Sequence, residues 1–481
     1  MLSEYNISKT SSVGSAFFGK IDVVALMLYA ILVGIGILSI TSASYDAEAA
    51  NGFSFAHNHM KQLVWAAISA VVALGVLLLD RRIFHMFAYP AYIAGILFLI
   101  AVLIFGREVN GAKAWFEFGG FRIQPVEFAK IATALMMARL MSDYSFSINR
   151  LPDLVKAAAV VALPLGIIIL QNDTGSGLVL CSFLFVLYRE GISRYIYFPI
   201  LFTAFLFAVS FIFTPEVIYT VLIVAFTIYS AIKCRELSLH IRFLAVVLLA
   251  ALLLSLFTPM SGYAALMVVC SIAALVVGYV AIRFRVLFLL WPVVLFVYAM
   301  LFVPTCDFLF TKLEPHQQNR ILTFVGMNSD PKGLDYNVNM SQKAIGSGGV
   351  WGKGFMEGPL IQNDFVPEKH TDFIFCTVGE EWGFVGVLVV VALYGALILR
   401  LMRMGERIRE PFGRVYCYCV ASILLFHIIV NIGMTIGLMP VIGIPLPLMS
   451  YGGSSLVAFT ILIMIAVRLD ASTSDEVVKQ V

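Results

Sequence analysis

The chain has 481 residues, of which 61% are hydrophobic and 13% charged, and its mean hydropathy is +0.95. Soluble domains contain roughly 45–50% apolar and about 25% charged residues, and a water-soluble globule of this length could not bury so much apolar surface. The composition therefore excludes a soluble enzyme, and the 39 Phe residues exclude a disordered chain. We interpret the sequence as that of a polytopic membrane protein.

The charge and the cysteines exclude further classes of protein. A net charge of +3 is too small to indicate a nucleic-acid partner. The seven cysteines show no ligand-like spacing to His, and we interpret those in or beside apolar runs as small buried hydrophobes, namely Cys181, Cys234, Cys270, Cys417 and Cys419. The first apolar run is too long for a cleavable signal peptide, so we interpret it as the first span.

Fourteen apolar runs approach the length of about 20 residues that a helix needs to cross a bilayer. In chain order we predict spans over residues 22–44, 61–79, 86–105, 124–142, 154–171, 174–188, 194–213, 216–232, 241–257, 262–282, 286–304, 373–399, 414–438 and 447–468. Lys and Arg are retained in cytoplasmic loops. Placing both termini in the cytoplasm puts nearly all of these basic residues on the inner side.

The connection over residues 106–123 departs from this pattern, because it carries Arg107, Lys113 and Arg122 on the predicted outer side. Outer positive charge in an otherwise consistent pattern indicates use on an anionic ligand. The alternative is that the run over 124–142 dips obliquely into the membrane, and the sequence leaves both interpretations open.

Residues 305–372 form a long polar and charged connection on the predicted outer face. A connection of this length in a compact body is usually functional or disordered, and its aromatic residues indicate an ordered, packed loop. Within it Asp330 precedes Pro331, which favours an extended backbone and a well-directed carboxylate that could cap a turn or act as a base. We therefore expect outer-face chemistry in this loop.

Glu127 and Lys130 follow Pro125, which suits the first turn of a helix. Three residues apart, they share one helix face about one turn inside the membrane, where ionisable side chains are costly and usually functional. The structural alternative is an internal salt bridge that holds helices together.

Other polar strings lie on the predicted outer side. The string over 171–177 fits a tight turn without any function, and the glycines over 346–354 would let backbone amides approach a ligand. His370 and Asp372 precede a predicted helix, where Asp372 suits the positive N-terminal end and His370 could pack or hydrogen-bond. The string over 444–455 bends the chain into the last span, and its small residues permit close helix packing.

Taken together, these strings resemble the SEDS family of polytopic cell-wall proteins, and its elongation branch more than its division branch. The motifs that carry the resemblance are Trp115 with Gln124-Pro125-x-Glu127-x-x-Lys130, Gln171-x-Asp173-x-Gly175, Asp330-Pro331-x-Gly333, Ala344-Ile345-Gly346-Ser347-Gly348-Gly349, Pro367-Glu368-x-His370-Thr371-Asp372-Phe373, Gly379-Glu380-Glu381 and Ser450-Tyr451-Gly452-Gly453-Ser454. The sequence departs from the family pattern at Val126, Asn172 and Asp335, where the family has Ser, Pro and Gly.

The resemblance implies an all-α polytopic membrane protein with a ten-helix SEDS core, to which the 14 predicted spans add about four helices. The implied divisions are a cytoplasmic tail over 1–21, the first part of the core over 22–188, inserted helices over 189–285, a core helix over 286–304, a catalytic outer loop over 305–372, the final three core helices over 373–468 and a cytoplasmic tail over 469–481. An even number of inserted helices keeps the long loop on the outer side.

The resemblance also implies a peptidoglycan glycosyltransferase that polymerises lipid II into β-1,4 glycan strands at the outer face of the bacterial cytoplasmic membrane during elongation. Asp330 matches the family's essential loop carboxylate and is the expected general base. The residues expected to bind substrate are Trp115, Arg122, Glu127, Lys130, Asp173, Arg320, Lys343, His370, Asp372 and Ser450.

The implied partners are a class B penicillin-binding transpeptidase and other membrane proteins of the elongation complex. A divalent cation, Mg²⁺ or Mn²⁺, is an implied cofactor for which the sequence shows no ligand spacing. The competing function is a lipid II flippase, which the intramembrane Glu127 and Lys130 would also suit. A transporter places its charged site in broken or repeated helices near the bilayer midplane, and no internal repeat relates the halves of this chain, so the polymerase is favoured.

Overall fold

The computed structural model describes residues 21–44, 58–109, 111–118, 121–210, 212–234, 237–257, 262–283, 285–312, 318, 322 and 334–479. By its internal contacts the chain divides into two compact units. We call Met1–Ile192 with Asp330–Val481 the core unit, and Ser193–Ser329 the insert unit.

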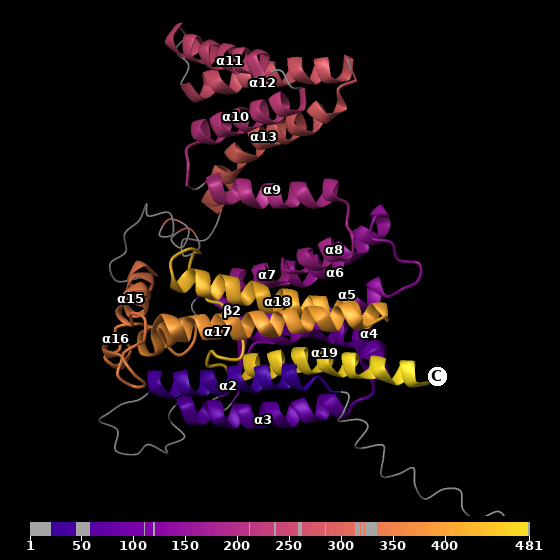
Figure 1. Cartoon of the computed structure of the whole chain (residues 1–481), viewed down its shortest axis with the longest axis vertical. Coiled ribbons are helices and arrows are strands. Elements are labelled where there is room, and N and C mark those ends of the chain that lie inside the picture. The colour runs from indigo at the N-terminus through magenta and orange to yellow at the C-terminus, as the bar shows by residue number, and fades with distance from the viewer. Residues whose placement is uncertain are drawn as a thin grey trace, which may run out of the picture. The chain divides into compact units, whose positions relative to one another are not determined.

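The core unit consists of helices and one small sheet (Figure 1), in the order α2 (Val23–Ala43), α3 (Asn58–Leu78), α4 (Arg81–Phe105), β1 (Arg107–Val109), β2 (Ala112–Phe118), β3 (Phe121–Ile123), α5 (Pro125–Met141), α6 (Leu151–Leu170), α7 (Thr174–Leu180), α8 (Phe183–Arg189), α15 (Leu334–Ser347), α16 (Pro359–Gln362), α17 (Ile374–Arg407), α18 (Pro411–Thr435) and α19 (Gly453–Lys479). Helix α18 contacts α5, α8, α17 and α19. Most side chains of α5 and α18 are buried. Because both helices are enclosed, polar side chains on them need partners within the protein.

Ten of the described helices are long and apolar enough to cross a membrane, namely α2, α3, α4, α6, α10, α12, α13, α17, α18 and α19. The chain is therefore a multi-pass membrane protein. The other four predicted spans coincide with α5, with α7 and α8 together, with α9 and with α11, which are shorter or less apolar. The total of 14 spans stays a prediction, as does the cytoplasmic position of the termini.

Several element boundaries differ from the prediction. The predicted span over 174–188 is broken between α7 and α8 by a turn at Cys181 and Ser182. Helix α13 continues through Pro304 to Lys312, because a proline within a membrane helix is tolerated where neighbouring groups satisfy the freed backbone. Helix α19 begins only at Gly453, since the prolines in the preceding string interrupt regular structure.

A three-stranded antiparallel sheet occupies residues 107–123, where the all-α prediction expects none. Arg107 on β1 lies opposite Trp115 on β2, and Glu117 on β2 lies opposite Arg122 on β3. Both arginines form ion pairs with Glu117, and for Arg122 the Nε–Oε1 distance is 3.5 Å. Two of the three unusual outer charges are thus paired within the sheet, as cross-strand neighbours of opposite charge commonly are.

Ion pairs join the helix ends that the sequence places on the inner side. Asp22, which caps α2, lies 2.8 Å from Arg400 Nε and 2.6 Å from Arg407 Nη2 of α17, and Arg407 also pairs with Asp470 of α19. Further pairs join Arg81 with Glu410, Arg189 with Glu406, and Arg414 with Glu190. These ends therefore gather at one end of the core unit, as the charge pattern predicts.

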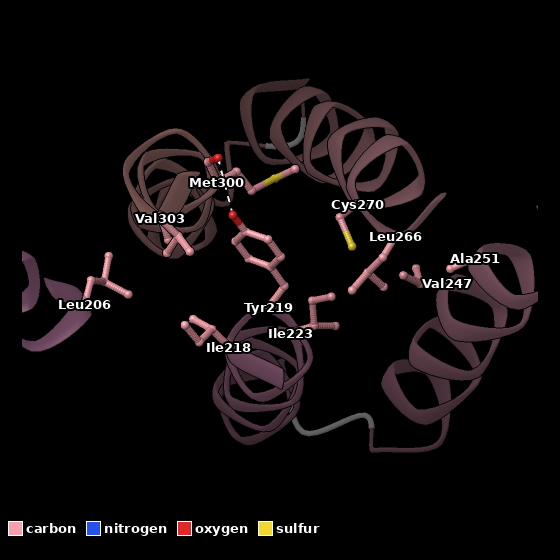
Figure 2. Close-up of a cluster of buried hydrophobic side chains, with 11 residues drawn as sticks. Leu206, Ile218, Tyr219, Ile223, Val247, Ala251, Leu266, Cys270, Met300 and Val303 are labelled. Atoms are coloured by element: carbon pink, nitrogen blue, oxygen red, sulfur yellow. Dashed lines mark hydrogen bonds between the residues drawn. The ribbon is translucent and has the colours of Figure 1, made fainter. Parts of the chain in front are cut away.

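The insert unit contains α9 (Arg194–Ser210), α10 (Pro215–Cys234), α11 (Leu237–Phe257), α12 (Gly262–Arg283), the short 3₁₀ helix η1 (Leu287–Leu289) and α13 (Leu290–Lys312). Helix α10 contacts α11 and α13, and α12 contacts the same two helices. Figure 2 shows their shared core, in which the Tyr219 hydroxyl donates to the Met300 carbonyl at 3.5 Å. Buried hydrophobic side chains from α9 to α13 form this cluster and pack the unit.

The predicted division of the chain stays a prediction. Helix α13, expected as part of the core, contacts α9, α10 and α12 of the insert unit. Of the cysteines interpreted as small hydrophobes, Cys270, Cys417 and Cys419 are buried, Cys181 is half-buried, and all four are free, which agrees with that interpretation.

Candidate functional site

A buried ion pair lies in the first two turns of α5. Pro125 begins the helix, and the spacing of three residues puts Glu127 and Lys130 on one face. Lys130 Nζ lies 2.9 Å from Glu127 Oε1, and the side chains are only 1% and 2% exposed. Charges buried this deeply are costly unless they are paired. The salt bridge that the spacing allows is therefore present, and a role in function stays a prediction.

His427 of α18 completes the surroundings of Lys130. Its Nε2 lies 3.0 Å from Lys130 Nζ, and its Nδ1 lies 3.1 Å from the carbonyl oxygen of Pro445. The ring of Phe459 on α19 lies 5.0 Å from Lys130 Nζ, within the range of a cation–π contact. The three N–H groups of the ammonium can thus be matched with a carboxylate, an imidazole nitrogen and an aromatic face.

His427 was not among the site residues predicted from the sequence. It lies inside the predicted span over 414–438, where a single His in an apolar run gives little signal. The available signal was periodic: His427, Asn431 and Thr435 recur at every fourth residue and therefore share one face of α18.

Asn431 connects this face of α18 to two polar strings: the one over 367–373, at the end of the outer loop, and the one over 444–455, after α18. Its Nδ2 donates to the carbonyl of Asp372 at 2.8 Å and to the carbonyl of Ile444 at 2.7 Å. Because Asn431 follows His427 by one helical turn, the structure brings Asp372 close to the buried pair.

The two strings are also bonded to each other. Ser450 Oγ donates to the carbonyl of Thr371 at 2.6 Å and accepts from the backbone N–H of Leu446 at 2.8 Å. The backbone N–H of Tyr451 donates to the carbonyl of His370 at 2.8 Å. Burial lowers the pKa of His370, which favours a neutral imidazole. The structure therefore brings together three predicted site positions, His370, Asp372 and Ser450.

Asp173 lies at the entrance of α5. It caps α7 by accepting from the backbone N–H of Ser176 at 3.1 Å, and its second oxygen accepts from Gln124 Nε2 at 2.9 Å. The predicted turn is present at residues 171–173, whereas residues 174–177 belong to the start of α7. The same carboxylate fixes the residue that precedes α5.

Trp115 and Arg122 lie on the sheet beside these strings. Trp115 is half-buried, and the side chain of Arg122 is 58% exposed. Burial raises the pKa of Tyr451, and the charge of Arg122 opposes that rise.

The remaining predicted residues are less closely connected to this group. Asp330 and Arg320 lie outside the described residues, so their predicted roles stay predictions. Lys343 is exposed on α15, which begins at Leu334 soon after Asp330 in the chain.

Glu380 of α17, which was not among the predicted site residues, organises the second half of the outer loop. Its side chain is fully buried. One oxygen lies 3.1 Å from Lys353 Nζ and 3.1 Å from the backbone N of Leu360, and the other accepts from the backbone N–H of Ile361 at 2.9 Å. The carboxylate thus holds α16 and the Gly-rich string against α17.

Glycines allow that string to approach α17 closely. A Cβ on Gly348 would lie 2.0 Å from the carbonyl oxygen of Gly379, and one on Gly352 would lie 2.1 Å from that of Glu381. Gly383 has φ 65° and ψ −162°, a backbone conformation that essentially only glycine adopts, and it kinks α17 at this contact. These glycines approach α17 closely, and the approach to a ligand stays a prediction.

The arrangement therefore places a buried pair of opposite charges next to the hydrogen-bonded strings. Electrostatic interactions are stronger in such a site than in water. Among the described residues, no group of three His, Cys, Asp or Glu side chains could hold a metal ion.

The comparison with known proteins assigns the family. A family model named FTSW_RODA_SPOVE, described as "Cell cycle protein", matches residues 23–224 and 217–475. The chain belongs to this family, the SEDS proteins. It is 34% identical over 441 residues to "Peptidoglycan glycosyltransferase RodA" of Treponema pallidum (strain Nichols), covering 90% of this chain and 94% of the relative.

A second relative and a solved structure agree with this assignment. "Peptidoglycan glycosyltransferase MrdB" of Escherichia coli (strain K12) is 31% identical over 398 residues, covering 81% of this chain and 80% of the relative. A chain from "Structural coordination of polymerization and crosslinking by a peptidoglycan synthase complex" superposes with a TM-score of 0.57 at 25% identity, covering 94% of this chain and 98% of that chain. Chains named as probable FtsW enzymes also match, at lower identity. The polytopic SEDS fold is therefore established for this SEDS chain.

Proposed function

We propose that this SEDS protein is a peptidoglycan glycosyltransferase that polymerises lipid II at the outer face of the bacterial cytoplasmic membrane during elongation. The main support is its similarity, over most of the length of both chains, to two relatives that carry this enzyme name. The family's loop carboxylate and its buried acid–base pair are both present in the sequence, as Asp330 and as Glu127 with Lys130.

The proposed reaction is a single inverting displacement. The 4-hydroxyl of the acceptor sugar attacks the anomeric carbon of a donor that is α-linked to undecaprenyl pyrophosphate. The new β-1,4 bond forms as the bond to the pyrophosphate breaks, and Asp330 takes the hydroxyl proton as general base. The departing pyrophosphate carries away the bonding electron pair and remains on the lipid.

The roles of the basic residues follow from the charge of the leaving group. Pyrophosphate gains negative charge in the transition state, and fixed positive charges nearby stabilise it. Arg122, whose side chain is 58% exposed although it pairs with Glu117, is proposed for direct contact, and Arg320 is proposed for the same task. Lys130 supplies a buried positive charge that Glu127 orients. Trp115 is proposed to contact sugar or lipid with its aromatic face.

A divalent cation enters the proposal only as an aid at the pyrophosphate. The described residues do not form a three-ligand site for such an ion, and the steps above do not depend on it.

A class B penicillin-binding transpeptidase is the proposed partner. The similar chain in a solved peptidoglycan synthase complex supports this pairing, because that complex is described as coordinating polymerization and crosslinking, and crosslinking is the reaction of a transpeptidase. Other membrane proteins of the elongation complex are proposed to join them.

The test uses the purified protein with its partner and lipid II in detergent, where no leaflet exists to cross. We expect ladders of glycan polymer on a gel, and none from the partner alone. If the complex makes no polymer while the protein moves lipid II across vesicle membranes, the flippase interpretation replaces this proposal.

A further inference from the structure

The polar face of α18 connects the buried pair to the outer loop. At a rise of 1.5 Å per residue, Asn431 lies about 6 Å and His427 about 12 Å from the outer end of the helix at Thr435. The Thr435 carbonyl accepts from Ser341 Oγ of α15 at 2.9 Å. In Figure 1, α15 lies beside one end of α18, and the two helices are in contact.

Each of the three polar residues on this face of α18 is hydrogen-bonded to a different part of the chain. Thr435 contacts α15, which follows Asp330 in the chain, and Asn431 holds the backbone of Asp372 and Ile444. At the deepest level, His427 contacts Lys130. The face thus extends from α15 to the buried ammonium.

The protonation of His427 follows from its two contacts. The Pro445 carbonyl can only accept a hydrogen bond, so Nδ1 carries a proton and donates to it. The ammonium of Lys130 can only donate, so Nε2 offers its lone pair. A doubly protonated imidazole would set two positive charges 3.0 Å apart without an acceptor between them. The neutral ring is therefore the form that fits both contacts.

We propose that His427 is a positioning residue for the reaction: by accepting from Lys130 and donating to Pro445, it holds the Lys130 ammonium beside Glu127 and fixes the pair relative to the outer strings. This inference rests on the proposed glycosyltransferase function. Displacement of a charged group by about 1 Å can lower a rate on the order of 10²-fold. A change at His427 should therefore act on kcat through Lys130.

The test compares three variants of α18 in the full chain with its partner. His427→Leu removes both polar atoms, whereas His427→Gln retains one acceptor and one donor. Ile428→Leu, a volume-conserving change at the next buried residue, is the matched control. We expect kcat to fall on the order of 10²-fold in His427→Leu with little change in KM for lipid II. His427→Gln should recover most of the rate, and Ile428→Leu should resemble the wild type.

A double-variant cycle separates positioning from packing. If His427 acts through Lys130, then His427→Leu should cause little further loss of kcat when it is added to Lys130→Met. An equal loss in both backgrounds, or no recovery in His427→Gln, would overturn the proposal.

The coupling can also be measured without activity. The same cycle on the free energy of unfolding in detergent should show that the two side chains interact, even if the wild type makes no polymer. Absence of polymer from the wild type would refute the proposed function, whereas additive unfolding energies would refute the Lys130–His427 coupling itself.

Discussion

Glu380 Oε2 accepts a hydrogen bond at 2.9 Å from the backbone N–H of Ile361. A carboxylate at the start of one membrane helix thereby holds the short helix α16, which would be too short to persist in isolation. The outer loop is thus fixed by α17 at a residue that is fully buried.

Replacement of Glu380 should destabilise the loop. Hydrogen bonds to charged groups contribute about 1.5–3 kcal/mol each, and Glu380→Ala removes several of them and leaves Lys353 without this carboxylate. We expect the free energy of unfolding in detergent to fall by about 3 kcal/mol or more. Glu357→Ala, at an exposed position of the same loop, should change little. An unfolding transition of Glu380→Ala at the wild-type temperature would show that the loop is held by other contacts.

Two glycines of α17 should respond in opposite ways to alanine. At Gly383 the positive φ and the contact with Gly352, whose N would lie 2.2 Å from a new Cβ, make Gly383→Ala strongly destabilising. Gly395 is helical and has no atom within 4 Å of a new Cβ. Gly395→Ala should be neutral or stabilise the helix by up to about 1 kcal/mol. Thermal unfolding of the purified variants measures both effects. Equal unfolding temperatures of Gly383→Ala and Gly395→Ala would contradict the role of Gly383 in the kink.

The buried pair on α5 should be strongly coupled. Removal of one partner of a buried ion pair costs about 3–5 kcal/mol, because the other charge is left uncompensated. We expect Glu127→Gln and Lys130→Met each to destabilise the protein, and the double variant to lose much less than their sum. Unfolding energies in detergent measure this cycle. If the losses of unfolding free energy in the two single variants simply added up in the double variant, the two side chains would not interact.

The inner network should make stability depend on acidic pH. Burial opposes ionisation of Asp22, but hydrogen bonds from Ala25, Arg407 and Arg400 outweigh it and lower the pKa below the ordinary 3.8. A lowered pKa means that the contribution of Asp22 is complete above about pH 4 and is lost as the pH falls through the folded-state pKa. In Asp22→Asn the unfolding temperature should be lower at neutral pH, and the difference from wild type should shrink below pH 4. A difference that stays constant from pH 7 to pH 3 would exclude this assignment.

The helices could be located from the sequence because apolar run length is a local property. All 14 predicted runs coincide with helices. The Glu127–Lys130 pair could be predicted because both residues lie within one turn of the same helix. Charge along the chain likewise indicated which helix ends gather together, as the Asp22 network shows.

The remaining features depend on contacts between distant segments. His427 is 297 residues from Lys130 in the chain, and Glu380 reaches a helix of only four residues. The sequence of an apolar run with one His does not show whether the imidazole packs in the core or contacts a buried ammonium. The sheet over 107–123 was missed because its short strands have no long alternating pattern.

The central claim is that this SEDS chain polymerises lipid II with Asp330 as the general base. Its most direct test is the initial rate of glycan synthesis by Asp330→Asn in complex with the partner, compared with Asp335→Asn from the same loop. We predict a loss on the order of 10²–10⁴-fold for Asp330→Asn and a near-normal rate for Asp335→Asn. Wild-type polymerisation by correctly folded Asp330→Asn would contradict the account.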